Sequence, residues 1–134
     1  MNVLVDTSVW SLALRRNASH GNAQQAELIE LIREGRVAML GAIRQELLSG
    51  IRTSDQYEKL RESLRAFPDV PLEAADYEEA ALCFNRCRAK GVQGSNTDFL
   101  ICAVSMRKNF PILSTDQDFE GFSRVLELEL YAPR

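Results

Sequence analysis

The sequence predicts a three-layer α/β/α fold with a mostly parallel central sheet, on the strength of two observations. Short apolar runs such as VLV at residues 3–5 have the continuous hydrophobicity of strands that are covered on both faces. Longer segments with helical periodicity separate these runs, and strands that alternate with helices form parallel sheets with helices on both sides. The length of 134 residues suits a single core, so residues 1–134 are expected to form one domain.

The expected elements follow one another without an internal repeat or a linker. Apolar or alternating runs predict strands at residues 3–5, 37–40, 69–72, 111–114 and 125–131. Segments with helical periodicity predict helices at residues 8–16, 23–34, 42–49, 55–67, 75–90 and 97–109. Asn22 and Ser54 are placed to cap the second and fourth helices, and Pro71 confines its strand to an edge or a loose pairing.

Composition and charge limit the functional class. The chain is 46% hydrophobic and 26% charged, which is typical of a soluble globular protein. It has no apolar stretch near the roughly 18 residues that a membrane span needs and no export signal at its start, so a cytoplasmic protein without membrane contact is expected. The net charge of −3 argues against a protein that grips nucleic acid through bulk positive charge, but not against an enzyme whose acids bind metal ions.

The cysteines do not form a convincing metal site. Cys83 and Cys87 lie four residues apart on an expected helix, but the one histidine, His20, is far away in a polar loop. Free thiols packed in the core are therefore expected for these two and for Cys102, which fits a reducing compartment.

Four acids are expected at one edge of the sheet. Asp6 follows the first strand and Asp116 follows the strand at 111–114. Glu46 lies about one turn into the helix after the second strand, and Asp98 lies in the first turn of an apolar helix. Sites in parallel sheets form beyond the carboxyl ends of the strands, so these side chains are expected to converge there.

Each acid also has a structural explanation when it is taken singly. Asp6 and Asp116 suit helix caps or turns, Asp98 suits the positive end of a helix dipole, and Glu46 suits a solvated helix face. Four such coincidences at one edge explain the pattern less well than a shared site does. Clustered carboxylates repel one another unless a cation lies among them, and oxygen ligands favour Mg²⁺ or Mn²⁺. Phosphodiester hydrolysis by a metal-activated water is the chemistry that suits this cluster.

Four sequence blocks resemble the signature blocks of PIN-domain proteins in order and spacing. They are VLVDTSVW, RQELLSGIR, GSNTDFLICA and ILSTDQDF, and together they run over nearly the whole chain. The blocks are most similar to those of bacterial toxin ribonucleases of the VapC type, from type II toxin–antitoxin systems. The resemblance implies a Mg²⁺- or Mn²⁺-dependent endoribonuclease with an RNA substrate, an antitoxin protein as partner, and a homodimer.

The resemblance also implies roles for individual residues. Asp6, Asp98 and Asp116 match the main metal ligands, and Glu46 matches an acid that binds the metal or helps to activate the attacking water. The small polar positions that orient these carboxylates match Thr7, Ser8 and Thr115.

Three further residues have two interpretations each. Asp118 is either an outer acid of the site or a solvated turn residue. Arg52 either contacts an RNA phosphate or forms an ion pair with the helix that carries Glu46. Trp10 is expected in the core or in a dimer interface rather than as a platform for a base. Substrate specificity is expected from surface shape and from loops such as residues 16–22.

Rival classes fit the sequence less well. A phosphatase of the haloacid-dehalogenase kind needs an aspartate two positions after its nucleophile, where this chain has Ser8. A receiver domain needs an isolated aspartate after the third strand and a late lysine, an arrangement the chain does not offer convincingly. The alternatives that remain are a non-catalytic PIN-like RNA-binding or scaffold module and a DNA-cleaving or structure-selective nuclease.

Overall fold

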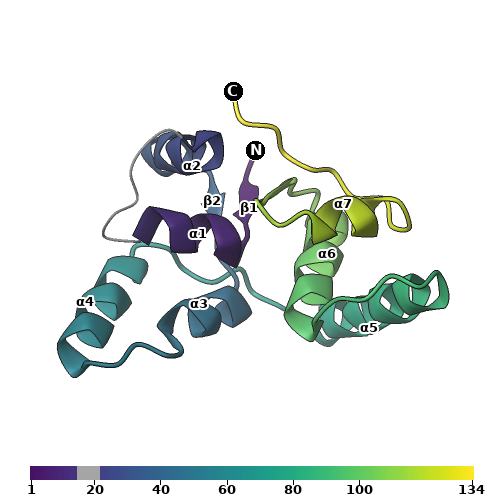
Figure 1. The fold of residues 1–134 in the computed structure, drawn as a ribbon, viewed down its shortest axis with the longest axis horizontal. Coiled ribbons are helices and arrows are strands. Elements are labelled where there is room, and N and C mark those ends of the chain that lie inside the picture. Colours follow the sequence, from purple (N-terminus) through teal and green to yellow (C-terminus); the bar gives the residue numbers. More distant parts are fainter. Residues whose placement is uncertain (15–21) are drawn as a thin grey trace.

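The computed structural model describes residues 1–14 and 22–134 (Figure 1). Three parallel strands form a sheet in the order β2-β1-β3, with β1 at Val3–Val5, β2 at Val37–Ala38 and β3 at Ile112–Leu113. The helices of the described residues are α1 (Thr7–Leu14), α2 (Ala23–Arg33), α3 (Gly41–Leu48), α4 (Ser54–Leu64), α5 (Ala74–Ala89), α6 (Asn96–Lys108) and α7 (Asp118–Ser123).

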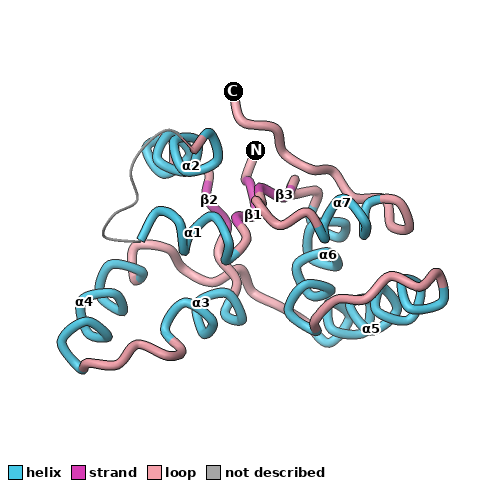
Figure 2. Tube along the Cα trace, in the orientation of Figure 1, coloured by secondary structure: helices cyan, strands magenta, loops and turns pink. Residues whose placement is uncertain are grey.

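The helices cover the sheet from two sides, which confirms the predicted three-layer architecture. Helices α1 to α4 gather beside β2, and helices α5 to α7 gather beside β3, with the short strands between the two groups (Figures 1 and 2). Helices α5 and α6 make the most extensive contact between two elements. No helix of the described residues is long and apolar enough to cross a membrane.

The central strand β1 explains why the sequence begins with an apolar run. Val3, Leu4 and Val5 have no exposed surface, because parallel neighbours flank the strand and helices cover both of its faces. In the pairing with β3, Leu4 lies opposite Ile112 and Val5 lies opposite Leu113. This register decides which residues meet beyond the strand ends.

Two predicted strands are reduced to single bridges. The segment 69–72 contributes one parallel bridge, between Met39 and Asp69, which fits the loose pairing expected beside Pro71. The segment 125–131 was predicted as a strand but pairs only at Leu130, opposite Ile112. The ladder would continue through the N–H group of residue 133, which is a proline and has none, so the chain leaves the sheet there.

The helix boundaries follow their capping residues with small differences from the prediction. Asn22 caps α2 as expected, because its side chain accepts a hydrogen bond from the N–H of Gln25 at 3.0 Å. Thr53, rather than Ser54, caps α4 through the N–H of Gln56. Helix α7 was not predicted, because its six residues are too few to display a helical period.

The side chains of Trp10 and of the three cysteines belong to the core. Trp10 is buried and packs edge-on against Phe67, with 5.1 Å between the ring centroids, which confirms the core alternative for this residue. The three cysteines are free and buried, as expected. Burial raises the pKa of the Cys83 thiol to about 11 and that of Cys102 still further, so these thiols stay protonated at neutral pH.

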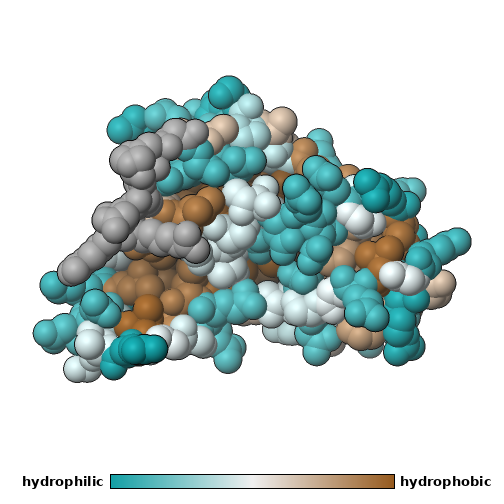
Figure 3. All heavy atoms as spheres, viewed as in Figure 1, coloured by the Kyte–Doolittle hydropathy of each residue, from teal (hydrophilic) through white to brown (hydrophobic). Residues whose placement is uncertain are grey.

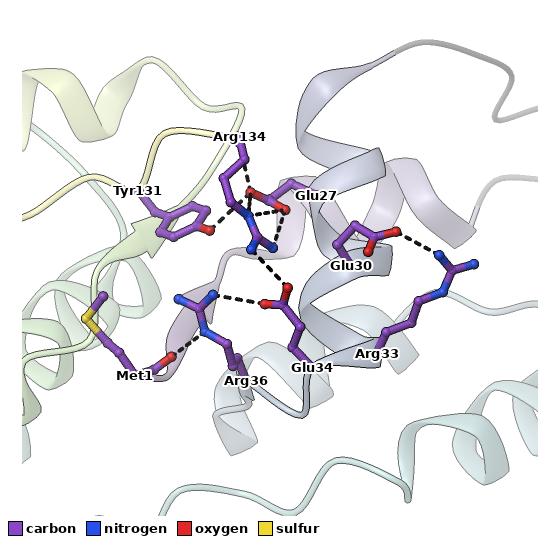
Figure 4. Close-up of polar contacts among 8 residues, drawn as sticks. All are labelled: Met1, Glu27, Glu30, Arg33, Glu34, Arg36, Tyr131 and Arg134. Atoms are coloured by element: carbon purple, nitrogen blue, oxygen red, sulfur yellow. Dashed lines mark hydrogen bonds and ion pairs between the residues drawn. The ribbon is translucent and has the colours of Figure 1, made fainter.

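A polar network ties the tail of the chain to α2 (Figure 4). The carboxylate of Glu27 is buried and accepts hydrogen bonds from the Tyr131 hydroxyl at 3.1 Å and from the Arg134 backbone and guanidinium at 2.9–3.0 Å. Arg134 also pairs with Glu34, which in turn pairs with Arg36. The hydrogen bonds of Arg134 lower the pKa of Glu27 to about 2.

The surface also carries an apolar groove. Hydrophobic residues gather over α1 and α4, on the face seen in Figure 3. A cavity of about 590 Å³ lies there between α1, α3 and α4, with Leu14, Leu47, Ile51 and Leu60 among its lining residues. The groove is separate from the acidic residues described next.

Candidate active site

The four acids predicted from the sequence line one cleft. Its volume is about 570 Å³, and it opens beyond the carboxyl ends of β1 and β3. The acids that line it are Asp6, Glu46, Asp98 and Asp116. The remaining lining residues are small or neutral, namely Thr7, Ser8, Ala42, Gln45, Ser49 and Thr97. Three of these were not among the residues predicted for the site: Gln45, Ser49 and Thr97.

Two hydroxyl groups hold Asp6 at the end of β1. Its side chain is buried, with 6% exposure, and its Oδ2 accepts hydrogen bonds from Ser8 Oγ and Ser114 Oγ, both at 2.8 Å. The register of β1 and β3 explains the second contact, because Val5 opposite Leu113 places Asp6 opposite Ser114. Neighbours in register point to the same side of a sheet, so Ser114 reaches the carboxylate.

Directly after β3, the hydroxyl that orients a carboxylate is that of Ser114, whereas Thr115 was expected in this role. The N–H of Thr115 donates to Ser8 Oγ at 3.1 Å, but its hydroxyl makes no hydrogen bond to a carboxylate of the described residues. Successive side chains of an extended segment point to opposite sides, so only one of two adjacent hydroxyls can face Asp6. The register that selects Ser114 is a property of the assembled sheet.

Glu46 projects from α3 into the cleft from the other side. It is exposed, and its Oε1 accepts a hydrogen bond from Thr7 Oγ1 at 2.6 Å. Thr7 is the residue after Asp6, so one turn at the start of α1 orients two of the acids. Thr7 Oγ1 thus donates to Glu46, and Ser8 Oγ donates to Asp6.

Asp98 is held by the cap of its own helix. Its Oδ2 accepts from the N–H of Ser95 at 3.0 Å, while its N–H donates to Ser95 Oγ at 3.1 Å, which is a reciprocal capping box. The spacing SNTD carried this signal in the sequence. Gly94 precedes the cap in a tight space, because a Cβ there would lie 2.5 Å from Cζ of Phe122.

Asp98 is electrostatically strained in the cleft. Burial raises the pKa of its carboxyl group, the hydrogen bonds from Ser95 oppose this, and repulsion from Asp6 and Asp116 adds to the increase. The negative charge is therefore only partly compensated by the protein. A cation in the cleft would relieve this repulsion.

Asp116 lies in the turn after β3. It is exposed, its N–H donates to Ser114 Oγ at 2.9 Å, and its Oδ1 accepts from the N–H of Asp118 at 2.9 Å. Asp118 is exposed at the start of α7, and its carboxylate makes no hydrogen bond to the described residues. Asp118 thus contributes its backbone to the site, while its side chain stays outside the cleft lining.

The four carboxylates share one arrangement. Each has one oxygen that accepts hydrogen bonds from the protein and a second oxygen that accepts none from the described residues. The second oxygens are Oδ1 of Asp6, Oε2 of Glu46, Oδ1 of Asp98 and Oδ2 of Asp116. Orientation by one oxygen leaves the other available to a ligand, and an all-carboxylate donor set suits a hard divalent cation.

The acids are not gathered into a direct three-ligand metal centre. Among the described residues, no three histidine, cysteine or acidic side chains converge closely enough to hold one metal ion. Mg²⁺ retains several of its waters when it binds protein, so a cleft with spaced carboxylates suits binding that is partly mediated by water. The donor set therefore fits a hydrated divalent cation.

No basic side chain of residues 1–14 or 22–134 lines the cleft. Arg52 is exposed beyond the end of α3, outside the cleft lining, and forms no ion pair with the described residues. Of the loop at residues 16–22, which was expected to affect specificity, only Asn22 lies within the described residues.

The chain belongs to the PIN-domain family, whose sequence pattern matches residues 3–125. It is 29% identical over 131 residues to the VapC ribonuclease Mb1587 of Mycobacterium bovis and to ribonuclease VapC11 of Mycobacterium tuberculosis. Both alignments cover 95% of this chain and 96% of the relative. The acids that the family resemblance selected are the ones that line the cleft.

Solved structures share the fold over the full length. VapBC2 from Rickettsia felis, bound to a DNA fragment from its promoter, has a TM-score of 0.77 at 18% identity, with 98% of each chain covered. FitAcB from Neisseria gonorrhoeae has a TM-score of 0.75 at 17% identity, covering 98% of this chain and 97% of that chain. A toxin–antitoxin complex from Klebsiella pneumoniae has a TM-score of 0.64 at 17% identity, covering 99% of this chain and 98% of the other.

Proposed function

We propose that this chain is a metal-dependent endoribonuclease, the toxin of a toxin–antitoxin pair, acting as one domain over residues 1–134. The observation that carries this proposal is the set of four oriented carboxylates, each with one oxygen left free, in a single cleft. Ribonucleases related over 95% of the chain favour RNA as the substrate.

The proposed roles follow from the contacts of each acid. Asp6, Asp98 and Asp116 would hold Mg²⁺ or Mn²⁺, directly or through water. A bound ion of this kind supplies a water of lowered pKa and stabilises negative charge on phosphoryl oxygens. Glu46 is held by Thr7, so its free oxygen is oriented to bind the ion or to accept a proton from the attacking water.

The hydroxyl groups act through the carboxylates. Ser8 and Ser114 fix the orientation of Asp6, and Ser95 fixes that of Asp98. Hydrolysis then forms a bond from the water oxygen to phosphorus and breaks one ester bond of the RNA backbone. Preorganised ligands of this kind contribute to rate because they do not need to reorient during the reaction.

The proposed partners are an antitoxin protein and a second copy of the chain. Two of the structural relatives are VapBC2 from Rickettsia felis and a toxin–antitoxin complex from Klebsiella pneumoniae. This similarity favours a protein partner here. An antitoxin segment that covers the acidic cleft would block it, and the apolar groove between α1, α3 and α4 offers a further surface.

The experiment that tests the function is cleavage of total bacterial RNA by purified, antitoxin-free protein. The assay is run with Mg²⁺, with Mn²⁺ and with EDTA, alongside Asp98→Asn and a matched single-stranded DNA. Discrete RNA fragments that require metal and vanish in the variant support the proposal. Cleavage of the DNA alone would instead favour the DNA-nuclease alternative. Intact RNA together with no metal binding in calorimetry would favour the scaffold alternative.

A further inference from the structure

A small apolar hollow lies beside the acidic cleft. Its volume is about 280 Å³, and it is formed where α5 and α6 pack together. Its lining residues are Tyr77, Ala80, Ala81, Asn96, Thr97 and Leu100. Thr97 lines both the hollow and the acidic cleft, so the two cavities lie on either side of one residue. The hollow therefore adjoins the cleft at Thr97.

Tyr77 is unusual among the aromatic residues because it is open to solvent. Its exposure is 56%, and the other exposed aromatic side chain of the described residues, Tyr57, lies on α4 and lines neither cavity. The buried side of α5 is formed by other residues, including Ala80, Cys83 and Cys87. The Tyr77 ring thus contributes little to the core and presents an aromatic surface beside the cleft.

The charge of the cleft makes such a surface useful for nucleic acid. Among the described residues, the cleft lining contains four acids and no lysine or arginine, and the chain has a net charge of −3. The described part of the cleft lining thus offers no basic side chain to neutralise a phosphate. Stacking of unpaired bases on aromatic rings is the other main source of affinity for single-stranded RNA, and it does not depend on positive charge.

We infer that this hollow is a nucleobase subsite, in which an unpaired base next to the cleaved phosphodiester stacks on Tyr77. This inference rests on the proposed ribonuclease function. Asn96 lies at the rim and offers both a donor and an acceptor to the edge of the base, and Thr97 offers a hydroxyl. Ala80, Ala81 and Leu100 supply the apolar part of the lining. The substrate is accordingly RNA that is single-stranded at the cleavage site.

The test uses a short single-stranded RNA that contains a cleavage site mapped with the wild type. Tyr77→Ala lowers kcat/KM on this RNA by roughly 5- to 150-fold, the range expected for the loss of one base stack, mainly through a higher KM. Tyr77→Phe, which keeps the ring, recovers most of this loss. The matched control is Leu82→Ala on the same helix, because Leu82 is also 56% exposed but lines neither cavity, and it leaves kcat/KM unchanged.

A second arm identifies the base. Abasic nucleotides are placed singly at the positions that flank the cleaved bond. One of them reduces cleavage by the wild type as much as Tyr77→Ala does, and it causes no further loss in the Tyr77→Ala protein, because both changes remove the same contact. Sedimentation of every variant at the assay concentration records its oligomeric state.

Three results would overturn the inference. The first is unchanged kcat/KM in Tyr77→Ala, and the second is full additivity of the variant and every abasic position. The third is that Tyr77→Ala loses the same factor in kcat/KM on intact and on abasic RNA and also dissociates from a dimer. This result would assign Tyr77 to contact between copies of the chain. These results leave Asp98-dependent cleavage by the wild type intact, whereas a wild type that cuts no RNA would overturn the proposed function itself.

Discussion

The network around Glu27 and the acidic cleft use carboxylates in opposite ways. Glu27 is buried but surrounded by donors, and the hydrogen bonds from Arg134 lower its pKa to about 2. Asp98 lies among other acids, and burial together with Asp6 and Asp116 raises its pKa. The charge of Glu27 is compensated by Arg134, and this ion pair joins two parts of the fold. The charge of Asp98 is not compensated by a basic group of the described residues, which is typical of a site that binds a ligand.

The strongest test of this difference is Asp98→Asn. The amide still accepts a hydrogen bond from Ser95, but it removes the negative charge, so metal-dependent RNA cleavage is expected to fall more than about a hundredfold. The metal-free variant is also expected to unfold at a higher temperature than the wild type, because repulsion with Asp6 and Asp116 is lost. Gel assays and calorimetric melting measure the two effects.

The control for this variant is Asp55→Asn. Asp55 likewise lies in the first turn of a helix, but it is exposed and outside the cleft. It is expected to change neither cleavage nor the effect of metal. Full cleavage by Asp98→Asn would remove Asp98 from the site, and a lower melting temperature without metal would show that repulsion is not its dominant interaction.

A smaller effect is expected from the hydroxyl that orients Asp6. Ser114→Ala removes the 2.8 Å hydrogen bond to Oδ2 and is expected to weaken metal affinity or cleavage by about 10- to 100-fold, as is typical for partners of metal ligands. Thr115→Ala at the adjacent position is expected to change either quantity less than about twofold, since its backbone N–H makes the contact. Equal losses in the two variants would contradict the register argument.

In the network around Glu27, Glu27→Gln is expected to lower the free energy of unfolding by about 2 kcal/mol at pH 7, because Arg134 loses its charged acceptor. The folded-state pKa of Glu27 is depressed, so its contribution is present above its ordinary pKa of 4.5 and is lost as the pH falls towards about 2. Urea unfolding at several pH values measures the difference between variant and wild type, which is expected to shrink below pH 4.5.

Glu30→Gln provides the comparison on the same helix. Glu30 pairs with Arg33 at the surface, so its loss is expected to cost less than about 0.5 kcal/mol. A difference between Glu27→Gln and the wild type that stays constant down to pH 2 would mean that the carboxylate charge of Glu27 is not what stabilises the tail.

The smallest expected effect is the stabilisation of the folded protein by Mg²⁺. At ten times its dissociation constant, an ion that binds only the folded state adds about 1.4 kcal/mol, which raises the melting temperature by a few degrees. The shift is expected in the wild type and in Glu27→Gln, and it is expected to be lost in Asp98→Asn. The same shift in all three proteins would place metal binding outside the cleft.

Much of this fold and site was predictable from local patterns. The apolar run before Asp6, the capping signal around Asn22 and the spacing from Ser95 to Asp98 are all read within a few residues, because strand burial and helix capping depend on near neighbours. The rule that sites form at the carboxyl ends of parallel strands then brought the four acids together before any contact was known.

Other features depended on contacts between distant segments. The choice of Ser114 over Thr115 follows from the register of β3 against β1, and the pair of Glu27 and Arg134 joins residues 107 positions apart. The alternating run at 125–131 looked like a strand, yet it forms one bridge. The N–H groups of Val125 and Leu126 bond to Phe122 in the turn after α7, and Pro133 cannot donate to the rung after Leu130.

The acids and their order along the chain were thus properties of the sequence, since each follows an element whose formation depends on local periodicity and capping. Whether Ser114 or Thr115 joins Ser8 in orienting Asp6, which charges are compensated and whether Tyr77 faces solvent were decided only when the elements packed. The physical reason is that a hydrogen bond or an ion pair requires two groups within a few ångströms, and for distant residues only the tertiary fold provides that proximity.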